Sequence, residues 1–265
     1  MARTCVEAGV HYVDLADGRE FVCGFAQLNE MARRAGVLAV SGASSVPGLS
    51  STVFAHLRRD FESVEDVAIA IAAVMNQPRG PAVVEAVLGY VGKPMPWLRD
   101  GRWGRMHGWQ DLRRRSFSGP GLRTLCNRWL AACDVPDLAL LPRHEPELRS
   151  VSFHAGLEVA AAHLGLWAAS WAVRCGLLRS LAPFAKGLSR LASLLSPLGS
   201  DSGGMFVELT GRGVDGQTRK ATWTLVAEQG HGPWVPVIPA IILATGLASG
   251  AIAQRGAFLV STFSL

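Results

Sequence analysis

Near the start of the chain, apolar positions alternate between helical and strand-like spacing. Residues 2–8 and 19–35 have apolar side chains at helical spacing, and a glycine follows each segment where a helix would end. Short apolar runs at 10–15 and 37–40 predict strands, and residues 47–61 predict another helix. This order is typical of a parallel sheet with crossover helices. We therefore expect an α/β unit in this part of the chain.

The middle of the chain has more strand signals than helix signals. Residues 64–74 alternate and then become fully apolar, and Asp100-Gly101 is a hairpin signal within residues 97–117. We also expect strands at 148–153, 205–209 and 221–226, a helix at 81–91, and a short helix or turn that begins at 134. Together these signals predict an α+β region with a mixed sheet.

Residues 157–198 are rich in Leu, Ala and Trp and predict two or three helices, with breaks near Gly176 and Pro183. The uncharged run inside this segment is too short to span a bilayer comfortably. The segment pairs apolar breadth with basic residues, which would allow it to lie on a membrane surface. A buried helical layer or an oligomer interface, such as that of a homodimer, is the favoured alternative.

Residues 235–253 form a second long uncharged segment. Hydropathy alone makes this segment a transmembrane candidate. However, Pro236 and Pro239 interrupt it near its start, and Gly246 and Gly250 interrupt it later. A buried helix that begins near Pro239 is therefore the better interpretation.

Composition and charge exclude several classes of protein. The net charge is +5, and basic residues cluster once, around 99–115, among tryptophans. Such a cluster can bind nucleic acid, but the hairpin signal inside it argues against that function. The five cysteines include no CxxC pair and their number is odd, which indicates a reducing compartment rather than a disulfide framework or a zinc site. The first residues are not a signal peptide, so we expect a cytoplasmic protein, with membrane association through 157–198 left open.

The short motifs that usually carry chemistry are weak in this sequence. One literal GxGxxG occurs at 211–216, but a strand follows it instead of a helix, so we interpret it as a hairpin turn. The GxSxG motif of hydrolases is absent, and no histidine has metal-ligand spacing, so we expect no metal. His231, between two glycines, is a weak catalytic candidate at a site mouth, although a plain loop histidine is the simpler interpretation.

The stretch 37–51 has the form of a buried strand, a tight loop and a helix start. Pro47 suits the first turn of the helix, and Gly42 and Gly48 allow the backbone close to a ligand or a neighbouring element. Asp14 follows the preceding strand, where ligand contacts collect in open α/β sheets. The alternatives are an ordinary βα turn and, for Asp14, a residue that stabilises a helix start.

Five segments of the chain resemble the saccharopine dehydrogenase-like oxidoreductases. These segments are CVEAGVHYVDLADGREFV, SGASSVPGLSS, FHAGLEVAAAHLGLWAASWAVRCGLLRSLAP, GSDSGGMFVELTG and GHGPWVPVIPA. Each motif is weak alone, but together they are quite specific and extend over nearly the whole chain. The resemblance implies NAD(P)-dependent hydride transfer on an amino-acid or keto-acid type substrate.

The resemblance also implies an arrangement of domains. We expect an α/β fold in which an incomplete Rossmann-like parallel sheet precedes an α+β domain with a mixed sheet and an apolar helical segment. The domains would be 1–62 for part of the dinucleotide-binding domain, 63–234 for substrate binding and dimerisation, and 235–265 for a helix that returns to the first domain. The resemblance places six residues along the nicotinamide side of an NAD or NADP site: Asp14, Ser41, Gly42, Ala43, Pro47 and Gly48.

The chain departs from the family pattern at its beginning. Family members carry a strand–GxGxxG–helix unit ahead of the VDL strand, and this sequence starts just before the helix that leads into that strand. We therefore expect a truncated chain that binds NAD(P) weakly or not at all, because the helix N-terminus that would hold the pyrophosphate is missing. Whether the chain is an enzyme stays open, and Asp14 and His231 are only weak catalytic candidates. The alternative is a non-catalytic remnant that acts as a dimerisation or membrane-surface module.

Overall fold

The computed structural model describes residues 1–74 and 80–262, which form two compact units. Unit 1 contains Met1–Asp60, Val135–Pro146 and Pro233–Leu265, and unit 2 contains Phe61–Asp134 and Glu147–Gly232. Unit 1 holds a parallel sheet and unit 2 a mixed sheet, so the predicted fold class is confirmed.

A three-stranded parallel sheet forms the centre of unit 1, in the order β1 (Tyr12–Val13), β2 (Leu38–Ser41) and β11 (Gly256–Leu259). All four residues of β2 are buried, as expected for a central strand covered on both faces. The strand predicted at 10–15 is much shorter than expected, and β11 was not predicted.

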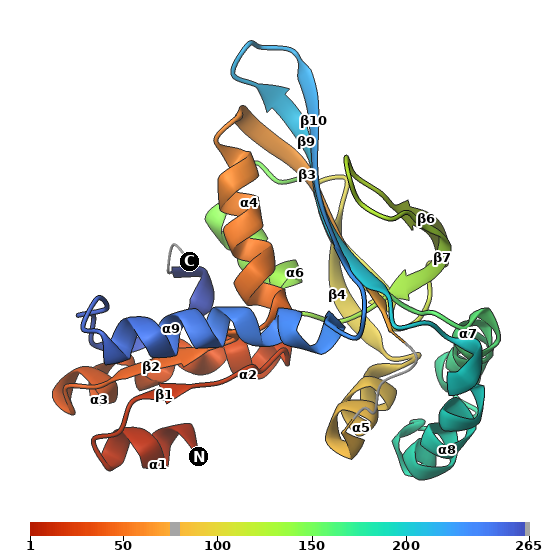
Figure 1. Cartoon of the computed structure of the whole chain (residues 1–265), viewed down its shortest axis with the longest axis horizontal. Helices are drawn as coiled ribbons and strands as arrows, with labels where there is room; N and C mark the ends of the chain where they lie inside the picture. Colours follow the sequence, from red (N-terminus) through yellow and green to blue (C-terminus); the bar gives the residue numbers. More distant parts are fainter. Residues whose placement is uncertain (75–79, 263–265) are drawn as a thin grey trace. The chain divides into compact units, whose positions relative to one another are not determined.

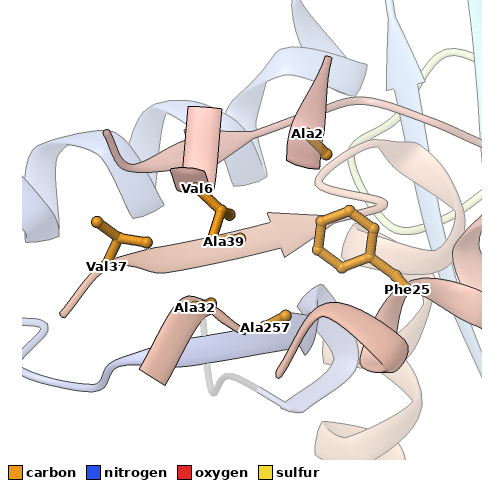
Figure 2. Close-up of a cluster of buried hydrophobic side chains, with 7 residues drawn as sticks. All are labelled: Ala2, Val6, Phe25, Ala32, Val37, Ala39 and Ala257. Atoms are coloured by element: carbon orange, nitrogen blue, oxygen red, sulfur yellow. The ribbon is translucent and has the colours of Figure 1, made fainter. Parts of the chain in front are cut away.

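Helices cover both faces of this sheet, which makes unit 1 a three-layer structure (Figure 1). On one face lie α1 (Ala2–Glu7), a 3-10 turn at Phe25–Leu28, and α3 (Asn29–Arg34). Figure 2 shows their apolar side chains around the central strand, a cluster that comprises Ala2, Val6, Phe25, Ala32, Val37, Ala39 and Ala257. On the other face, Leu38 and Val40 pack with Leu243 of α9 (Ile238–Ala248). Side chains alternate along β2, so each face of the strand serves a different helix layer.

Two expectations for the helices of unit 1 are corrected. The single helix expected at 19–35 is interrupted: α2 (Arg19–Gly24) ends at Gly24, and the 3-10 turn separates it from α3. Glycine is a poor residue for a helix interior, which favours the break there. The helix at 238–248 begins beside Pro239 as predicted, but it is not buried all round, since Ile238, Ile241 and Ile242 are exposed.

The remaining helices of unit 1 are α4 (Ser50–Arg58) and α6 (Asp137–His144). The α6 segment comes from the middle of the sequence and packs against α2. An ion pair between Arg58 Nε and Glu145 Oε1, 3.1 Å apart, links the ends of α4 and α6. Unit 1 is thus assembled from three separate stretches of the chain.

The main sheet of unit 2 has six strands in the order β10-β9-β3-β8-β7-β6. The strands are β3 (Phe61–Ala73), β6 (Arg113–Phe117), β7 (Leu125–Ala132), β8 (Ser150–Leu157), β9 (Gly203–Gly213) and β10 (Thr218–Ala227). Only β3 and β8 pair in parallel, and the other neighbours are antiparallel. The hairpin β4 (Pro94–Arg99) and β5 (Arg102–His107) is a separate two-stranded sheet. The GxGxxG at 211–216 lies in the β9–β10 turn, which confirms that it is a hairpin.

The described part of unit 2 contains three α-helices: α5 (Pro81–Tyr90), α7 (Ala160–Arg174) and α8 (Ala185–Leu195). The breaks near Gly176 and Pro183 are confirmed. The expectation that this segment forms a buried helical layer is wrong within the chain, because Trp171 and Leu191 are exposed. No helix among the described residues is long and apolar enough to cross a membrane.

Candidate functional site

The predicted ligand-facing residues of unit 1 meet at one edge of its sheet. The three strands run parallel, so the residues that follow them, Asp14 after β1 and Gly42 after β2, lie at the same carboxyl edge. Asp14 Oδ1 accepts hydrogen bonds from Ser41 Oγ at 2.9 Å and from the backbone N–H of Gly42 at 3.0 Å. The N–H of Ala43 donates to the backbone oxygen of Asp14 at 2.8 Å. The structure therefore brings together four of the six predicted cofactor-binding residues.

The Asp14 carboxylate also affects the tyrosine on its own strand. Desolvation is the larger cause and the Asp14 charge the next, and together they raise the pKa of Tyr12 to about 12. The Tyr12 phenol therefore stays protonated at neutral pH. Asp14 Oδ2 is buried and receives none of the bonds made by Ser41 and Gly42.

The other two predicted residues, Pro47 and Gly48, pack closely against other residues of unit 1. Gly42 has φ +83°, and a Cβ there would lie 2.9 Å from the Pro47 ring. A Cβ on Gly48 would lie 3.1 Å from Pro239 and 3.2 Å from the Gly42 oxygen. Glycine is therefore needed at position 42, whereas a side chain at position 48 would require Pro239 to move slightly.

Four backbone donors of this loop are used inside the chain. Besides Gly42 and Ala43, the N–H of Ser44 donates to the Gly42 oxygen at 2.7 Å, and that of Leu49 donates to the Ser44 oxygen. A phosphate group needs several free N–H donors at a loop or helix start. The chemistry of the loop fits one wall of a nicotinamide site, with the Asp14 carboxylate at its edge, and does not fit a pyrophosphate cradle.

The helix that follows the loop begins with a residue of a buried polar pair, Ser50 and Asp137. Ser50, the first residue of α4, donates a 2.6 Å hydrogen bond to Asp137 Oδ1 at the start of α6. Asp137 is 1% exposed, and desolvation raises its pKa to about 6. This pair joins the helix that follows the loop to the one that arrives from the middle of the sequence.

The remaining catalytic candidate, His231, does not join this cluster, and neither does Asp17. His231 is an exposed residue of unit 2, and its backbone N–H donates to the Glu228 oxygen. Asp17 lies in unit 1, but its side chain is exposed. No three metal-ligating side chains gather anywhere in the described residues.

Unit 2 contains a second polar cluster, which the sequence did not predict. Asp111 Oδ2 accepts hydrogen bonds from Arg99 at 3.2 Å and from Arg113 at 3.0 Å, and it lies 3.1 Å from Nε2 of buried His154. The bond to His154 is the largest cause that holds the pKa of Asp111 well below its usual range. Desolvation is the largest cause that lowers the pKa of His154. At neutral pH the cluster therefore has two arginine charges, one carboxylate and a neutral imidazole.

A cavity of about 360 Å³ adjoins this cluster on one face of the six-stranded sheet. Asp66 pairs with Ser150 and Thr210, and Ala68 with Ser152 and Glu208, so these six side chains share one face. They line the cavity, and its walls include Trp97, Arg99 and Arg113. The volume is at the small end of the range for ligand pockets, about 300–1,000 Å³.

Sequence analysis missed both the Ser50–Asp137 pair and the Asp111–His154 cluster. The partners are 87 and 43 positions apart in the chain, so no local spacing links them. The structure itself marks this segment locally: Trp109 and Asp111, two residues apart, have positive φ of +62° and +54°. Such backbone is uncommon outside glycine and often marks a functional segment.

The layered unit 1, with a parallel sheet and a cluster of polar groups at its carboxyl edge, is a Rossmann-like α/β structure. The whole chain is similar in fold to apo saccharopine dehydrogenase (L-Glu forming) from Saccharomyces cerevisiae. That similarity has a TM-score of 0.62 and 14% identity, and covers 98% of this chain and 76% of the other. The fold expected from the sequence resemblance is therefore confirmed.

A further solved structure is more distant. C. glutamicum DAP dehydrogenase in complex with DAP has a TM-score of 0.45 and 13% identity, over 98% of this chain and 71% of the other. That likeness is too weak to add to the fold assignment. The chain matches no protein-family model and no curated protein.

Proposed function

We propose that the chain is an NAD(P)-dependent oxidoreductase that acts on an amino-acid or keto-acid type substrate. The observation that carries this proposal is the cluster of Asp14, Ser41, Gly42 and Ala43 at the carboxyl edge of the parallel sheet. In open α/β sheets, ligands bind in the crevice at this edge. When bound, the nicotinamide would supply the hydride acceptor or donor. Asp14 and its loop would form the wall against which the ring is held.

The division of labour would follow the domains expected from the sequence. Residues 1–62 and 235–265 would provide the cofactor side, and residues 63–234 would provide the substrate side. The substrate side has a suitable site in the cavity beside Arg99 and Arg113. Each guanidinium has five N–H donors, and the bonds to Asp111 use only one from Arg99 and two from Arg113. The remaining donors suit a substrate carboxylate, and Asp66 on the cavity floor suits an ammonium group.

Nicotinamide binding is tested most directly by ligand-observed NMR with NADH and NADPH. We expect saturation transfer to the nicotinamide protons to exceed that to the adenine protons, because the loop supplies a ring wall but not a phosphate cradle. Asp14→Asn keeps an oxygen for Ser41 but loses the charge, and we expect it to weaken the nicotinamide signal. Asp17→Asn removes an exposed carboxylate nearby and is the matched control.

One result would contradict the proposed nicotinamide site, and a second would contradict the expectation of weak binding. Equal signals for both variants and the unaltered chain would remove Asp14 from the site. Micromolar affinity for the whole dinucleotide, measured by calorimetry, would show that binding is not weak and that the phosphates are held by residues of this chain.

The substrate side is tested separately by calorimetric titration with a panel of α-amino acids and 2-keto acids. Arg99→Gln removes one charged donor group from the cavity wall, and we expect it to weaken carboxylate binding by about tenfold or more. Arg102→Gln, an exposed arginine on the adjacent strand β5, should bind like the unaltered chain. If no panel member binds, or if both variants lose affinity equally, the cavity is not the substrate site.

The second candidate is a non-catalytic interaction module that acts through residues 157–198. The observation that favours it is the exposure of large apolar side chains on the helices of that segment. Activity separates the two functions: an interaction module would not oxidise NADH with any keto acid and amine in the panel. Self-association is measured by light scattering over a range of protein concentrations.

A further inference from the structure

Four exposed apolar side chains of unit 2 gather along one side of α8 and of the 3-10 turns at its two ends. We call this surface the leucine face, and it comprises Phe184, Leu191, Leu194 and Leu198. Leu194 is 76% exposed and Leu198 is 73% exposed. Positions 184, 191 and 198 are two helical turns apart and Leu194 is three residues from Leu191, so the set forms one stripe.

Part of the apolar surface of α8 is turned away from its own protein. The one fully buried residue of this helix is Ala185, a small side chain, and the helix lies against α5 (Figure 1). A helix that packs only on its own protein gains most by burying its leucines. Here Leu188 and Leu195 are only half-buried, and Leu191 and Leu194 face solvent, which indicates a surface used for something outside the chain.

The charged residues around the leucine face indicate what kind of surface it binds. Residues 159–200 contain no Asp or Glu, but they contain Arg174, Arg179, Lys186 and Arg190. Lys186 and Arg190 are exposed and one turn apart on α8, at the border of the leucine face. Basic side chains of this kind extend along apolar surface and place their charge at anionic headgroups. A second copy of the same face would bring like charges together, which opposes self-association.

The helical segment that contains the leucine face is anchored where its two ends meet. Glu158, just before α7, pairs with Arg128 at 3.0 Å and accepts a 2.8 Å hydrogen bond from the backbone N–H of Ser200, after α8. Both ends of the helical segment therefore meet at one buried ion pair. The leucine face therefore lies on the surface of the folded protein and is accessible without unfolding.

We infer that the leucine face docks α8 onto the surface of an anionic lipid bilayer, with the helix in the plane of the interface. Leucine and phenylalanine side chains enter the headgroup–acyl boundary, and Lys186 and Arg190 bind lipid phosphates. The inference concerns unit 2 alone and does not depend on the oxidoreductase function.

The test is flotation of the full-length chain with vesicles. One set contains phosphatidylglycerol and phosphatidylcholine in equal parts, and the other contains phosphatidylcholine alone. We expect the chain to float with the anionic vesicles, to stay largely unbound with the neutral ones, and to be released by high salt. Leu191→Ser combined with Leu194→Ser should lower the partition coefficient by about tenfold or more, since two apolar side chains that enter the bilayer are lost.

Charge variants give the second measurement. Lys186→Gln with Arg190→Gln should weaken binding to anionic vesicles by about tenfold, whereas Arg3→Gln with Arg33→Gln removes two exposed charges from unit 1 and should leave binding unchanged. Circular dichroism confirms that each variant is folded. Three outcomes would overturn the inference: no flotation with anionic vesicles, equal binding by the leucine variant, or a stable dimer that the leucine variant dissociates.

Discussion

Single residues of the candidate site are constrained by backbone geometry, and Gly42 shows this most directly. Replacing Gly42 with alanine would place a Cβ 2.9 Å from the Pro47 ring, on a residue with φ +83°. We expect the substitution to lower the free energy of unfolding by about 2 kcal/mol or more, from left-handed strain and from the clash. Urea denaturation measures the change.

Gly18→Ala is the control for this prediction. Gly18 has φ −72° and open space where its Cβ would lie, so alanine should change stability by less than about 1 kcal/mol. Equal losses for Gly18→Ala and Gly42→Ala would show that the tight Gly42–Pro47 contact does not stabilise the loop.

The sequence predicted part of the site at this scale. Asp14 and the loop after β2 follow predicted strands, and the carboxyl ends of parallel strands share one edge, so strand prediction was enough to bring them together. Asp137 could not be found in this way. Its partner Ser50 is 87 positions away, and α6 reaches unit 1 only through the tertiary fold.

At the scale of elements, the helical segment of unit 2 depends on the ion pair at its base. The side chain of Glu158 is 8% exposed and that of Arg128 is 17% exposed. Removing one partner of a buried pair leaves the other charge uncompensated, so we expect Glu158→Ala to destabilise the protein by about 3 kcal/mol. Hydrogen exchange should become faster in α7 and α8.

An exposed ion pair provides the control. Glu30 and Arg34 of α3 are 3.0 Å apart, but most of both side chains faces solvent. Such pairs contribute little, so Glu30→Ala should change stability by less than about 1 kcal/mol. If hydrogen exchange in α7 and α8 is unchanged in Glu158→Ala, the pair does not hold the helical segment.

Elements with a clear local pattern were predicted, and those that depend on partners were missed. β3 alternates and then becomes apolar, and the β9–β10 turn contains a glycine signal, so both were found. β7 (LCNRWLAA) has no such alternation, and Asn127 within it has φ +49°. β11 has only four residues, which become a strand through parallel pairing with β2.

At the scale of the whole molecule, the two units contain buried groups that respond to acid in opposite directions. In unit 1, burial raises the pKa of Asp137 to about 6, above the ordinary 3.8. Its stabilising contribution is therefore complete below pH 3.8 and is lost as the pH rises through 6. In unit 2, burial lowers the pKa of His163 from 6.5 to about 4, so its contribution is complete above pH 6.5 and is lost as the pH falls through 4.

Each difference of about two pH units corresponds to about 3 kcal/mol. In the unaltered chain the two contributions largely cancel between pH 6.5 and pH 4, so single substitutions should reveal them. When the pH falls from 6.5 to 4, protonation of Asp137 stabilises the unaltered chain. The Asp137→Asn variant lacks this gain, so its stability relative to the unaltered chain should fall by about 3 kcal/mol. Over the same fall in pH, protonation of His163 destabilises the unaltered chain. The His163→Asn variant lacks this loss, so its stability relative to the unaltered chain should rise by a similar amount.

Urea denaturation of the three chains at neutral pH and near pH 4 measures both effects. Asn at position 163 keeps an acceptor for the N–H of Leu157, which His163 Nδ1 binds at 3.2 Å, so that backbone bond is preserved. Asn at position 137 likewise keeps an oxygen for Ser50. If both variants follow the pH dependence of the unaltered chain, the two groups do not change their protonation on unfolding as their burial requires. If the variants diverge in the stated directions, the acid response of the whole chain is a balance between a carboxyl in unit 1 and an imidazole in unit 2.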